Sequence, residues 1–243
     1  MRPNPEHEHA WRHAAAWAAE VGLPAAPGAA RSCAYRHPTA PRRELGVVTC
    51  WYTWLSFVDR HFLDGCHRLR TGQARTQRLA AFMPVTGGPT TEPARPAEAG
   101  LADLWARTVP GRSPAWRARL AEEVSRLLME SLWRLVIGYR HPLGSPAWSA
   151  ALVEYSTGAE VPGESVRVLN RHFADCARLA EAEAGAGRLL DARLRQFDTF
   201  SLVQLPALTG DERVLRYATG LRDWLHGGHR GSPAPAPAPL TSH

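Results

Sequence analysis

Apolar residues recur every three or four positions along much of the chain, the spacing that places them on one face of an α-helix. The clearest run follows Ser113 and Pro114, where one predicted face carries Leu120, Val124, Leu127, Leu128, Leu132 and Leu135. Continuous runs of β-branched residues, which are typical of strands, are few. We therefore expect an all-α protein with almost no sheet.

Helix-starting and helix-stopping residues predict the elements of the first half. Asn4 as N-cap and Pro5 in the first turn start a helix that ends at Gly22, and a loop rich in Pro, Ala and Gly follows. A strongly apolar helix is expected over residues 44–64, before Gly65. Residues 84–96 hold several Pro and Gly and predict a surface loop.

Further helices are expected in the second half, after the long one that starts at Ser113. Breaks are predicted at Pro142, Gly144 and Pro146, and at the pair Pro162 and Gly163. Three more helical stretches should follow, over about 164–184, 187–204 and 212–226.

Length and composition favour one domain. The chain has 243 residues, of which 44% are hydrophobic, enough for one sizeable core. We expect a helical domain over residues 1–227, with an internal Pro/Gly-rich loop at 84–98. Residues 228–243 include alternating Pro and Ala and predict a disordered tail of polyproline character.

The charge pattern leaves two explanations open. All 29 basic residues are Arg and the formal net charge is +6, which is compatible with a polyanionic partner. The arginines are spread along the chain rather than gathered in a block, and a chain rich in Ala and free of Lys is also typical of a GC-rich genome. We favour the second explanation and expect no nucleic-acid partner.

Cysteine usage and hydropathy predict a cytoplasmic protein. Its four cysteines are scattered, with no C-x-x-C pair, so we expect free thiols rather than a zinc cage or disulfides. No secretory leader pattern is present at the start. The longest nearly uncharged stretch, residues 45–58, has 14 residues, too few to span a bilayer.

Asp59 stands out because its predicted helical neighbours are apolar. Counting by helical steps places Leu55, Tyr52, Val48 and Phe62 on its face. A carboxylate buried on such a face is destabilising unless a cation or hydrogen-bond donors meet it. Two explanations follow: a structural ion pair with a distant arginine, or a cavity that holds a metal or a ligand.

The residues around Asp59 resemble a known motif. Residues 54–64 read WLSFVDRHFLD and resemble the aspartate-rich motif of bacterial class I terpene synthases, commonly Asp-Asp-His-Phe followed by Leu-Glu or Asp-Glu. Asp59 keeps the first acidic position, Arg60 replaces the second, and Asp64 takes the last.

The resemblance extends over most of the chain, in the family's order. Its further segments are the opening Asn-Pro with Trp17, ADLW at 102–105, SPAWR at 113–117 and LVEYSTGAEVP at 152–162. It implies a single-domain class I terpene synthase helical bundle, although the chain is shorter than typical members.

The resemblance also implies a chemistry and shows where the chain departs from it. In the family, carboxylates at the positions of Asp59 and Asp64 hold Mg²⁺, which binds the substrate diphosphate, and an arginine at about Arg140 senses that diphosphate. A second motif chelates Mg²⁺ through Asn, Ser and Glu. Its positions align with Gly185, Leu189 and Arg193, none of which is a ligand type. A shifted register near Gly185 is the alternative.

We therefore expect a terpene synthase-like protein that binds a prenyl diphosphate with Mg²⁺ and ionises or cyclises it weakly. Asp59 should point into a central cavity near Arg140, and Arg60 and Arg193 should also contact the diphosphate. The alternative is a non-catalytic member of the fold that binds an isoprenoid or a protein. A homodimer is left open.

Two other groups of residues have simpler explanations. His7, His9 and His13 share the first helix without an acidic partner, and we expect a solvated face rather than a metal site, as for His226 and His229. Aromatic residues of the second predicted helix could line a pocket for a carbocation, but core packing is the commoner role. They are Trp51, Tyr52, Trp54 and Phe57.

Overall fold

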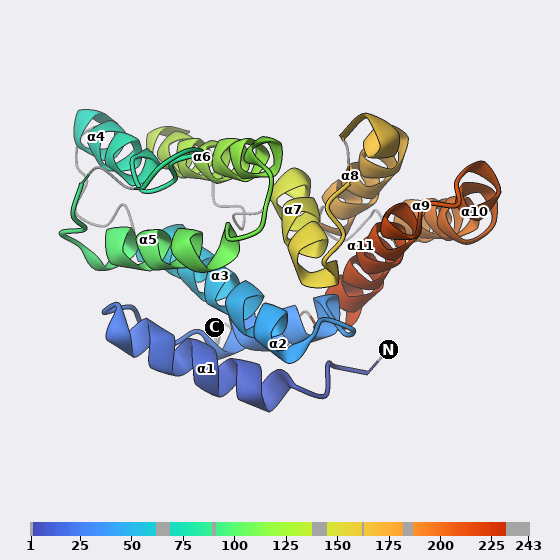
Figure 1. Ribbon diagram of the computed structural model, residues 1–243, viewed down its shortest axis with the longest axis horizontal. Coiled ribbons are helices and arrows are strands. Elements are labelled where there is room, and N and C mark those ends of the chain that lie inside the picture. Colours follow the sequence, from blue (N-terminus) through green and yellow to red (C-terminus); the bar gives the residue numbers. More distant parts are fainter. Residues whose placement is uncertain are drawn as a thin grey trace, which may run out of the picture.

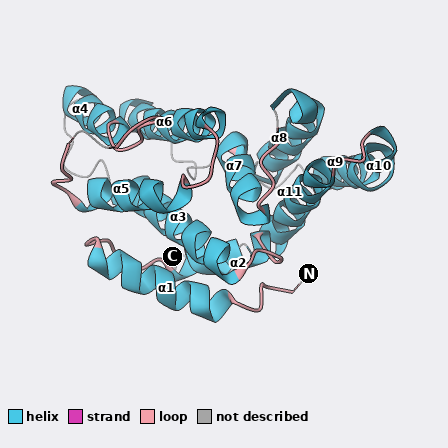
Figure 2. Ribbon diagram, viewed as in Figure 1, coloured by secondary structure: helices cyan, strands magenta, loops and turns pink. Residues whose placement is uncertain are grey.

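All regular structure in the described part of the chain is helical (Figure 2). The computed structural model describes residues 2–61, 69–88, 91–137, 145–161, 163–181 and 187–231. The helices of the first half are α1 (His7–Glu20), α2 (Pro27–Arg36), α3 (Arg42–His61), α4 (Leu69–Ala80), α5 (Pro96–Thr108) and α6 (Pro114–Ile137). Those of the second half are α7 (Pro146–Thr157), α8 (Arg167–Glu181), α9 (Gly187–Thr199), α10 (Leu205–Leu208) and α11 (Glu212–Gly231). A 3₁₀ turn, Gly163–Val166, precedes α8, and a π-helical turn, Phe200–Gln204, joins α9 to α10. The all-α prediction is confirmed.

Two hydrophobic clusters form the core, and α7 contributes to both. In Figure 1, α1 to α6 occupy one side of the molecule and α8 to α11 the other, with α7 between them. Leu152 and Tyr155 of α7 pack into the first cluster, whereas Ala150 and Val153 pack into the second. The middle turns of α7 are therefore buried on all sides.

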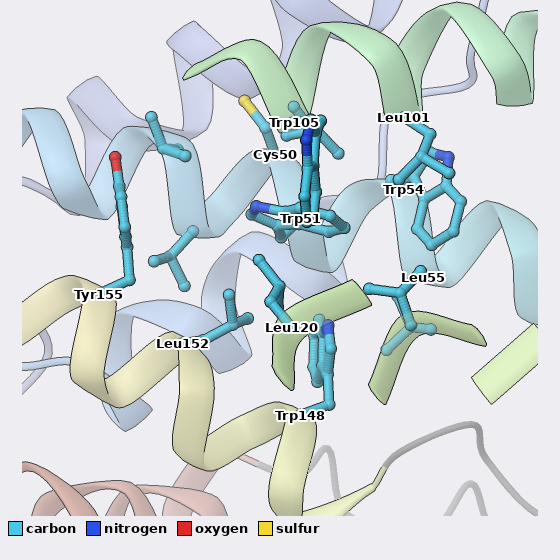
Figure 3. Close-up of a cluster of buried hydrophobic side chains, with 14 of the residues drawn as sticks. Cys50, Trp51, Trp54, Leu55, Leu101, Trp105, Leu120, Trp148, Leu152 and Tyr155 are labelled. Atoms are coloured by element: carbon cyan, nitrogen blue, oxygen red, sulfur yellow. The ribbon is translucent and has the colours of Figure 1, made fainter. Parts of the chain in front are cut away.

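The first cluster is rich in tryptophan (Figure 3). Trp51 and Trp54 are fully buried, and both indole N–H groups have partners: Trp51 donates to Thr108 Oγ1 at 2.9 Å and Trp54 to the Ala97 carbonyl at 3.0 Å. A buried indole N–H is destabilising without such a partner. These two residues belong to the core, the commoner role expected for them.

The long amphipathic helix lies where the apolar spacing predicted it. In α6 the aliphatic residues of the predicted face are buried from Leu120 to Leu132, and the side chain of Leu135 lies outside the described set. Ser113 Oγ accepts a hydrogen bond from Trp116 N at 3.1 Å, as an N-cap residue does.

The expected loops are partly wrong, because several prolines start helices instead of ending them. A loop was expected after Gly22, yet α2 begins at Pro27; α5 begins at Pro96, inside the loop predicted over 84–98; and α7 begins at Pro146. Proline lacks an N–H and has a fixed φ, which suits the first turn of a helix. The sequence patterns predict no helix at α2, α4 or α7.

Asn4 has a wider role than the predicted N-cap. The first helix begins at His7, and Asn4 Oδ1 accepts from Glu6 N at 2.9 Å. Its amide Nδ2 donates to the carbonyls of His37 and Ala40 at 2.8 and 2.9 Å. Asn4 is buried and thereby fixes the start of the chain to the α2–α3 connection.

The boundary predicted for the disordered tail is wrong at its start. α11 continues through Gly227 and Gly228 to Gly231. A Cβ at Gly227 would lie 2.0 Å from the Tyr35 carbonyl oxygen, so glycine is required for α11 to approach α2 this closely. The glycine pair is therefore a packing feature of a helix. Residues 232–243 lie outside the described residues, and their polyproline character stays a prediction.

Among the described residues, the structure agrees with the predictions of free cysteines and of no membrane-spanning helix. Cys33, Cys50 and Cys176 are free and buried, whereas Cys66 lies outside the described residues. In the described ranges, no helix combines the length and apolar character needed to cross a bilayer.

His37 is a buried polar link between α2 and α7. Its Nδ1 lies 3.0 Å from Ser156 Oγ, and the side chain is 3% exposed. Burial, and to a lesser degree the neighbouring Arg36 charge, lowers the pKa of His37 to about 3. The imidazole is therefore neutral in the folded protein at neutral pH.

Replacing Gly227 by alanine should destabilise the protein, although alanine is the better helix former. The new Cβ would meet backbone atoms of Tyr35, so α2 and α11 must move apart, and overpacking of this kind costs about 1–3 kcal/mol or more. The matched control is Gly228→Ala, whose Cβ would meet only the flexible end of Arg36 at 3.3 Å. Urea unfolding should show a clear loss for Gly227→Ala and a much smaller change for the control; equal effects would contradict the packing.

Acidification should destabilise the protein through His37. Its pKa in the folded state, about 3, lies below the value of about 6.5 for an unfolded chain. Between these values the unfolded state binds the extra proton, so stability falls as pH falls, by about 1.4 kcal/mol per pH unit. From pH 7 to pH 5, wild type should lose about 2 kcal/mol more free energy of unfolding than His37→Asn. Parallel losses would show that His37 is not held neutral.

Candidate functional site

One face of α3 runs from the core to the surface and ends at Asp59. Val48 is fully buried, Tyr52 is partly buried, Leu55 is 8% exposed, and Asp59 is exposed. The expectation that Asp59 is a carboxylate on a buried apolar face is therefore wrong, because that face reaches solvent in the last turns of the helix. Asp59 is placed at the rim of the buried face rather than inside it. Arg60 beside it is also exposed.

An aromatic cluster lies under this rim and joins four helices. Tyr52 of α3 accepts a hydrogen bond from Trp224 Nε1 of α11 at 2.9 Å. Its ring lies 5.4 Å from that of Trp148 on α7 and 5.9 Å from that of His37, just after α2. Trp224 also contacts Phe173 of α8 edge-on at 5.2 Å. The face of α3 below Asp59 is thus packed against aromatic side chains from both core clusters.

The electrostatics of this cluster are set by one cation. The guanidinium carbon of Arg36 lies 3.8 Å from the ring centroid of Trp224, a close cation–π contact. Burial raises the pKa of Tyr52 to about 12, so its hydroxyl stays protonated, and His37 is neutral. Arg36 therefore supplies the permanent charge among these aromatic residues.

The predicted second metal motif falls on α9, and its described positions are not metal ligands. Leu189 is 53% exposed, and Arg193 is exposed and donates from Nη1 to Gln196 Oε1 at 3.0 Å. Gly185 lies outside the described residues. Further along α9, both carboxylate oxygens of Asp198 lie 3.1 Å from His226 Nε2 on α11. His226, expected on a solvated face, thus links α11 to α9.

The structure does not bring the two predicted motifs into direct contact in the part that it describes. α9 packs against α8 and α11, and in Figure 1 it lies apart from α3, with α7 between them. Asp64 and Arg140 lie outside the described residues. That Asp59 points into a central cavity near Arg140 therefore stays a prediction.

Among the described positions of the two motifs, only Asp59 has a side chain of the type that Mg²⁺ prefers. Mg²⁺ prefers oxygen ligands and is commonly held by one or two carboxylates together with substrate phosphates. Asp59 offers such a carboxylate at an exposed position. Leu189 and Arg193 offer no oxygen, and the described residues contain no group of three acidic, His or Cys side chains placed to hold a metal ion.

Sequence reasoning missed most of the aromatic cluster. Tyr52 was considered as a pocket residue, but Trp148, Trp224, Arg36 and His37 were not. Tyr52 and Trp224 are 172 residues apart in the chain, and no local pattern indicates that they meet. The family resemblance over 152–162 does not extend to Trp148, near the start of α7, and no helix is predicted there.

Comparison with known proteins identifies the segment that carries Asp59. The family model described as terpene synthase family 2, C-terminal metal binding, matches residues 50–141. This segment runs from α3 past the end of α6, and it includes both Asp59 and Arg140. It ends before α9, where Leu189 and Arg193 stand at positions that the resemblance aligns with the second metal motif.

Curated relatives match part of the chain. Pentalenene synthase from Streptomyces exfoliatus is 29% identical over 164 residues, which is 61% of this chain and 44% of that protein. Pentalenene synthase from Streptomyces avermitilis is 31% identical over 129 residues, 49% of this chain and 38% of that one. The chain thus spans less than half the length of these relatives in the matched regions.

Solved structures match nearly the whole fold. Wild-type cucumene synthase superposes with a TM-score of 0.73 at 22% identity, covering 95% of this chain and 96% of that one. Germacradien-4-ol synthase from Streptomyces citricolor gives the same TM-score at 18% identity, with the same coverage. At such low identity these likenesses show the fold alone. With the matched metal-binding segment and the bacterial relatives, the all-helical fold makes this chain similar to terpene synthases.

Proposed function

We propose that the chain binds a prenyl diphosphate, with the diphosphate at the Asp59 end of α3 and the hydrocarbon directed toward the aromatic cluster. The observation that carries this proposal is the position of Asp59. It is exposed at the end of a helix face that continues down to the Tyr52–Trp224 hydrogen bond. The same face lies in the segment that matches the metal-binding model. A prenyl diphosphate has a charged diphosphate and an apolar hydrocarbon chain. These two parts would match a helix face that is polar at Asp59 and aromatic at Tyr52.

Asp59 and Asp64 are the residues that we propose to hold Mg²⁺. The ion, when bound, supplies positive charge that stabilises the departing diphosphate. Asp59 is exposed near the end of α3. Asp64 is five positions further along the chain.

We propose that arginines supply part of the positive charge that a metal ion bound at the second motif would otherwise provide. Arg193 takes a metal-ligand position, is exposed, and has a neutral hydrogen-bond partner in Gln196. Neither Arg193 nor Arg60 makes an ion pair with the residues that the structure describes. Guanidinium groups bind phosphate oxygens directly, often in a bidentate way. Arg140 is the third proposed contact.

Two features favour weak or altered catalysis over efficient cyclisation. The described α9 positions lack metal ligands, and lost charge stabilisation at a leaving group slows a reaction tenfold for each 1.4 kcal/mol or so of barrier. In addition, Arg36 already covers one face of Trp224. Its positive charge opposes the approach of a carbocation to that ring. We therefore propose that this protein still binds a prenyl diphosphate but converts it to product inefficiently.

Binding and turnover should separate in experiment. Calorimetry should detect farnesyl diphosphate binding that persists in EDTA, because arginines contact the phosphates without a metal. Product analysis with Mg²⁺ should find little hydrocarbon or alcohol. The double variant Arg60→Gln with Arg193→Gln should bind the ligand about tenfold more weakly or worse, from the loss of charge-assisted hydrogen bonds.

The matched control is Arg31→Gln, which removes an exposed arginine of α2 and should leave the affinity unchanged. Robust Mg²⁺-dependent cyclisation by wild type would show that the second metal motif has been misplaced. Complete loss of binding in EDTA would show that the arginines do not replace the metal.

A further inference from the structure

A basic groove lies between α1, α3 and α5, away from Asp59. It encloses about 650 Å³, and its charged or titratable lining consists of His9, His13, Arg42, Arg43 and Arg107. The rest of the lining is small and apolar. No carboxylate is among its described lining residues. The groove therefore presents one sign of charge around an apolar floor.

Two of the arginines form ion pairs with carboxylates that do not line the groove. Arg42 Nε lies 2.6 Å from Glu6 Oε2, and Arg107 Nε lies 2.6 Å from Asp103 Oδ2. Trp17 Nε1 donates to the same Asp103 oxygen at 2.7 Å, which fixes that carboxylate. The closest ion-pair contact of each guanidinium group is made by Nε. Such bracing lowers the entropy lost on binding.

Arg43 adds a third guanidinium to the lining, whereas the surroundings of His13 disfavour its charged form. Arg43 is exposed and makes no ion pair with the residues that the structure describes. Burial, and then the positive charges of Arg107 and His9, lowers the pKa of His13, while Glu20 and Asp103 act in the opposite direction. A Cβ at Gly46 would lie 3.1 Å from the His13 ring, so the ring packs closely on α3.

We propose that this groove is a binding site for a phosphorylated small molecule, recognised through its phosphate groups by Arg42, Arg43 and Arg107. Three guanidinium groups, from α3 and α5, suit the several oxygens of an oligophosphate better than a single carboxylate. The concave shape and limited volume suit a small molecule rather than a nucleic-acid strand.

The groove is separate from the proposed prenyl diphosphate site. Its α3 residues lie at the start of that helix and Asp59 lies near its end. The thirteen positions from Gly46 to Asp59 span about 20 Å at 1.5 Å per residue. The inference does not depend on the proposed function, and each can fail without the other.

Imidazole NMR tests the site, because His9 and His13 report on this groove and not on Asp59. Inorganic diphosphate, added in EDTA, should shift both resonances saturably and raise the pKa of His13, since a bound anion offsets the charges of Arg107 and His9 that lower it. Arg43→Gln, which breaks no ion pair, should weaken this response about tenfold. Arg42→Gln combined with Arg43→Gln should weaken it further.

Two controls separate this site from others. Arg216→Gln removes an exposed arginine of α11 and should leave the His13 response unchanged, as should Arg60→Gln combined with Arg193→Gln. If millimolar diphosphate leaves the His9 and His13 resonances unmoved, the proposal is overturned. It is equally overturned if Arg43→Gln and the double groove variant respond as wild type does.

Discussion

The hydrogen bond from Trp224 to Tyr52 joins the two halves of this protein. Tyr52 packs against the first hydrophobic cluster and Trp224 belongs to the second. The bond requires α11 to lie close against α2 and α3, and Gly227 permits that approach because it has no Cβ to meet the Tyr35 carbonyl. Arg36 then stacks on Trp224, and His37 and Trp148 pack around Tyr52. A single close helix contact thus determines both the closure of the bundle and the chemistry of its aromatic cluster.

This arrangement explains why the candidate site changes along α3 from a polar end at Asp59 to an apolar, aromatic part at Tyr52. α3 leaves the core between Leu55 and Asp59, so a carboxylate stands at the rim of a face whose lower part is aromatic. The rim has kept an acidic residue, whereas α9 has an arginine at a position where the resemblance implies a metal ligand. Diphosphate affinity and diphosphate departure have different requirements. Arginines or metal ions can both provide diphosphate affinity. Departure of the diphosphate depends on positive charge that is placed to stabilise the leaving group.

The sequence predicted the elements whose signals are local. The spacing of Leu120, Val124 and Leu127 placed α6, and the apolar run before Asp59 placed α3. Pro27, Pro96 and Pro146 were misread because a proline ends one helix or begins another, and the chain around it does not distinguish the two cases.

The candidate site was less predictable, for two physical reasons. Helical periodicity showed which residues share a face with Asp59 but not where that face emerges from the core, so the exposure of Asp59 was missed. The meeting of Tyr52 with Trp224 depends on how distant helices pack. The resemblance supplied the aligned positions on α9, and the structure shows Leu189 and Arg193 exposed there.

We propose that α3 carries a metal-binding carboxylate, whereas Leu189 and Arg193 of α9, at positions that the resemblance aligns with the second metal motif, are not metal ligands. The most direct measurement is the Mg²⁺ dependence of farnesyl diphosphate turnover in a triple variant, Gly185→Asn with Leu189→Ser and Arg193→Glu, compared with wild type. We predict that the variant, folded by circular dichroism, gains a stronger response to Mg²⁺, because the three positions of the second motif would carry oxygen ligands and a cation would be removed. A folded variant with an unchanged response would contradict the claim.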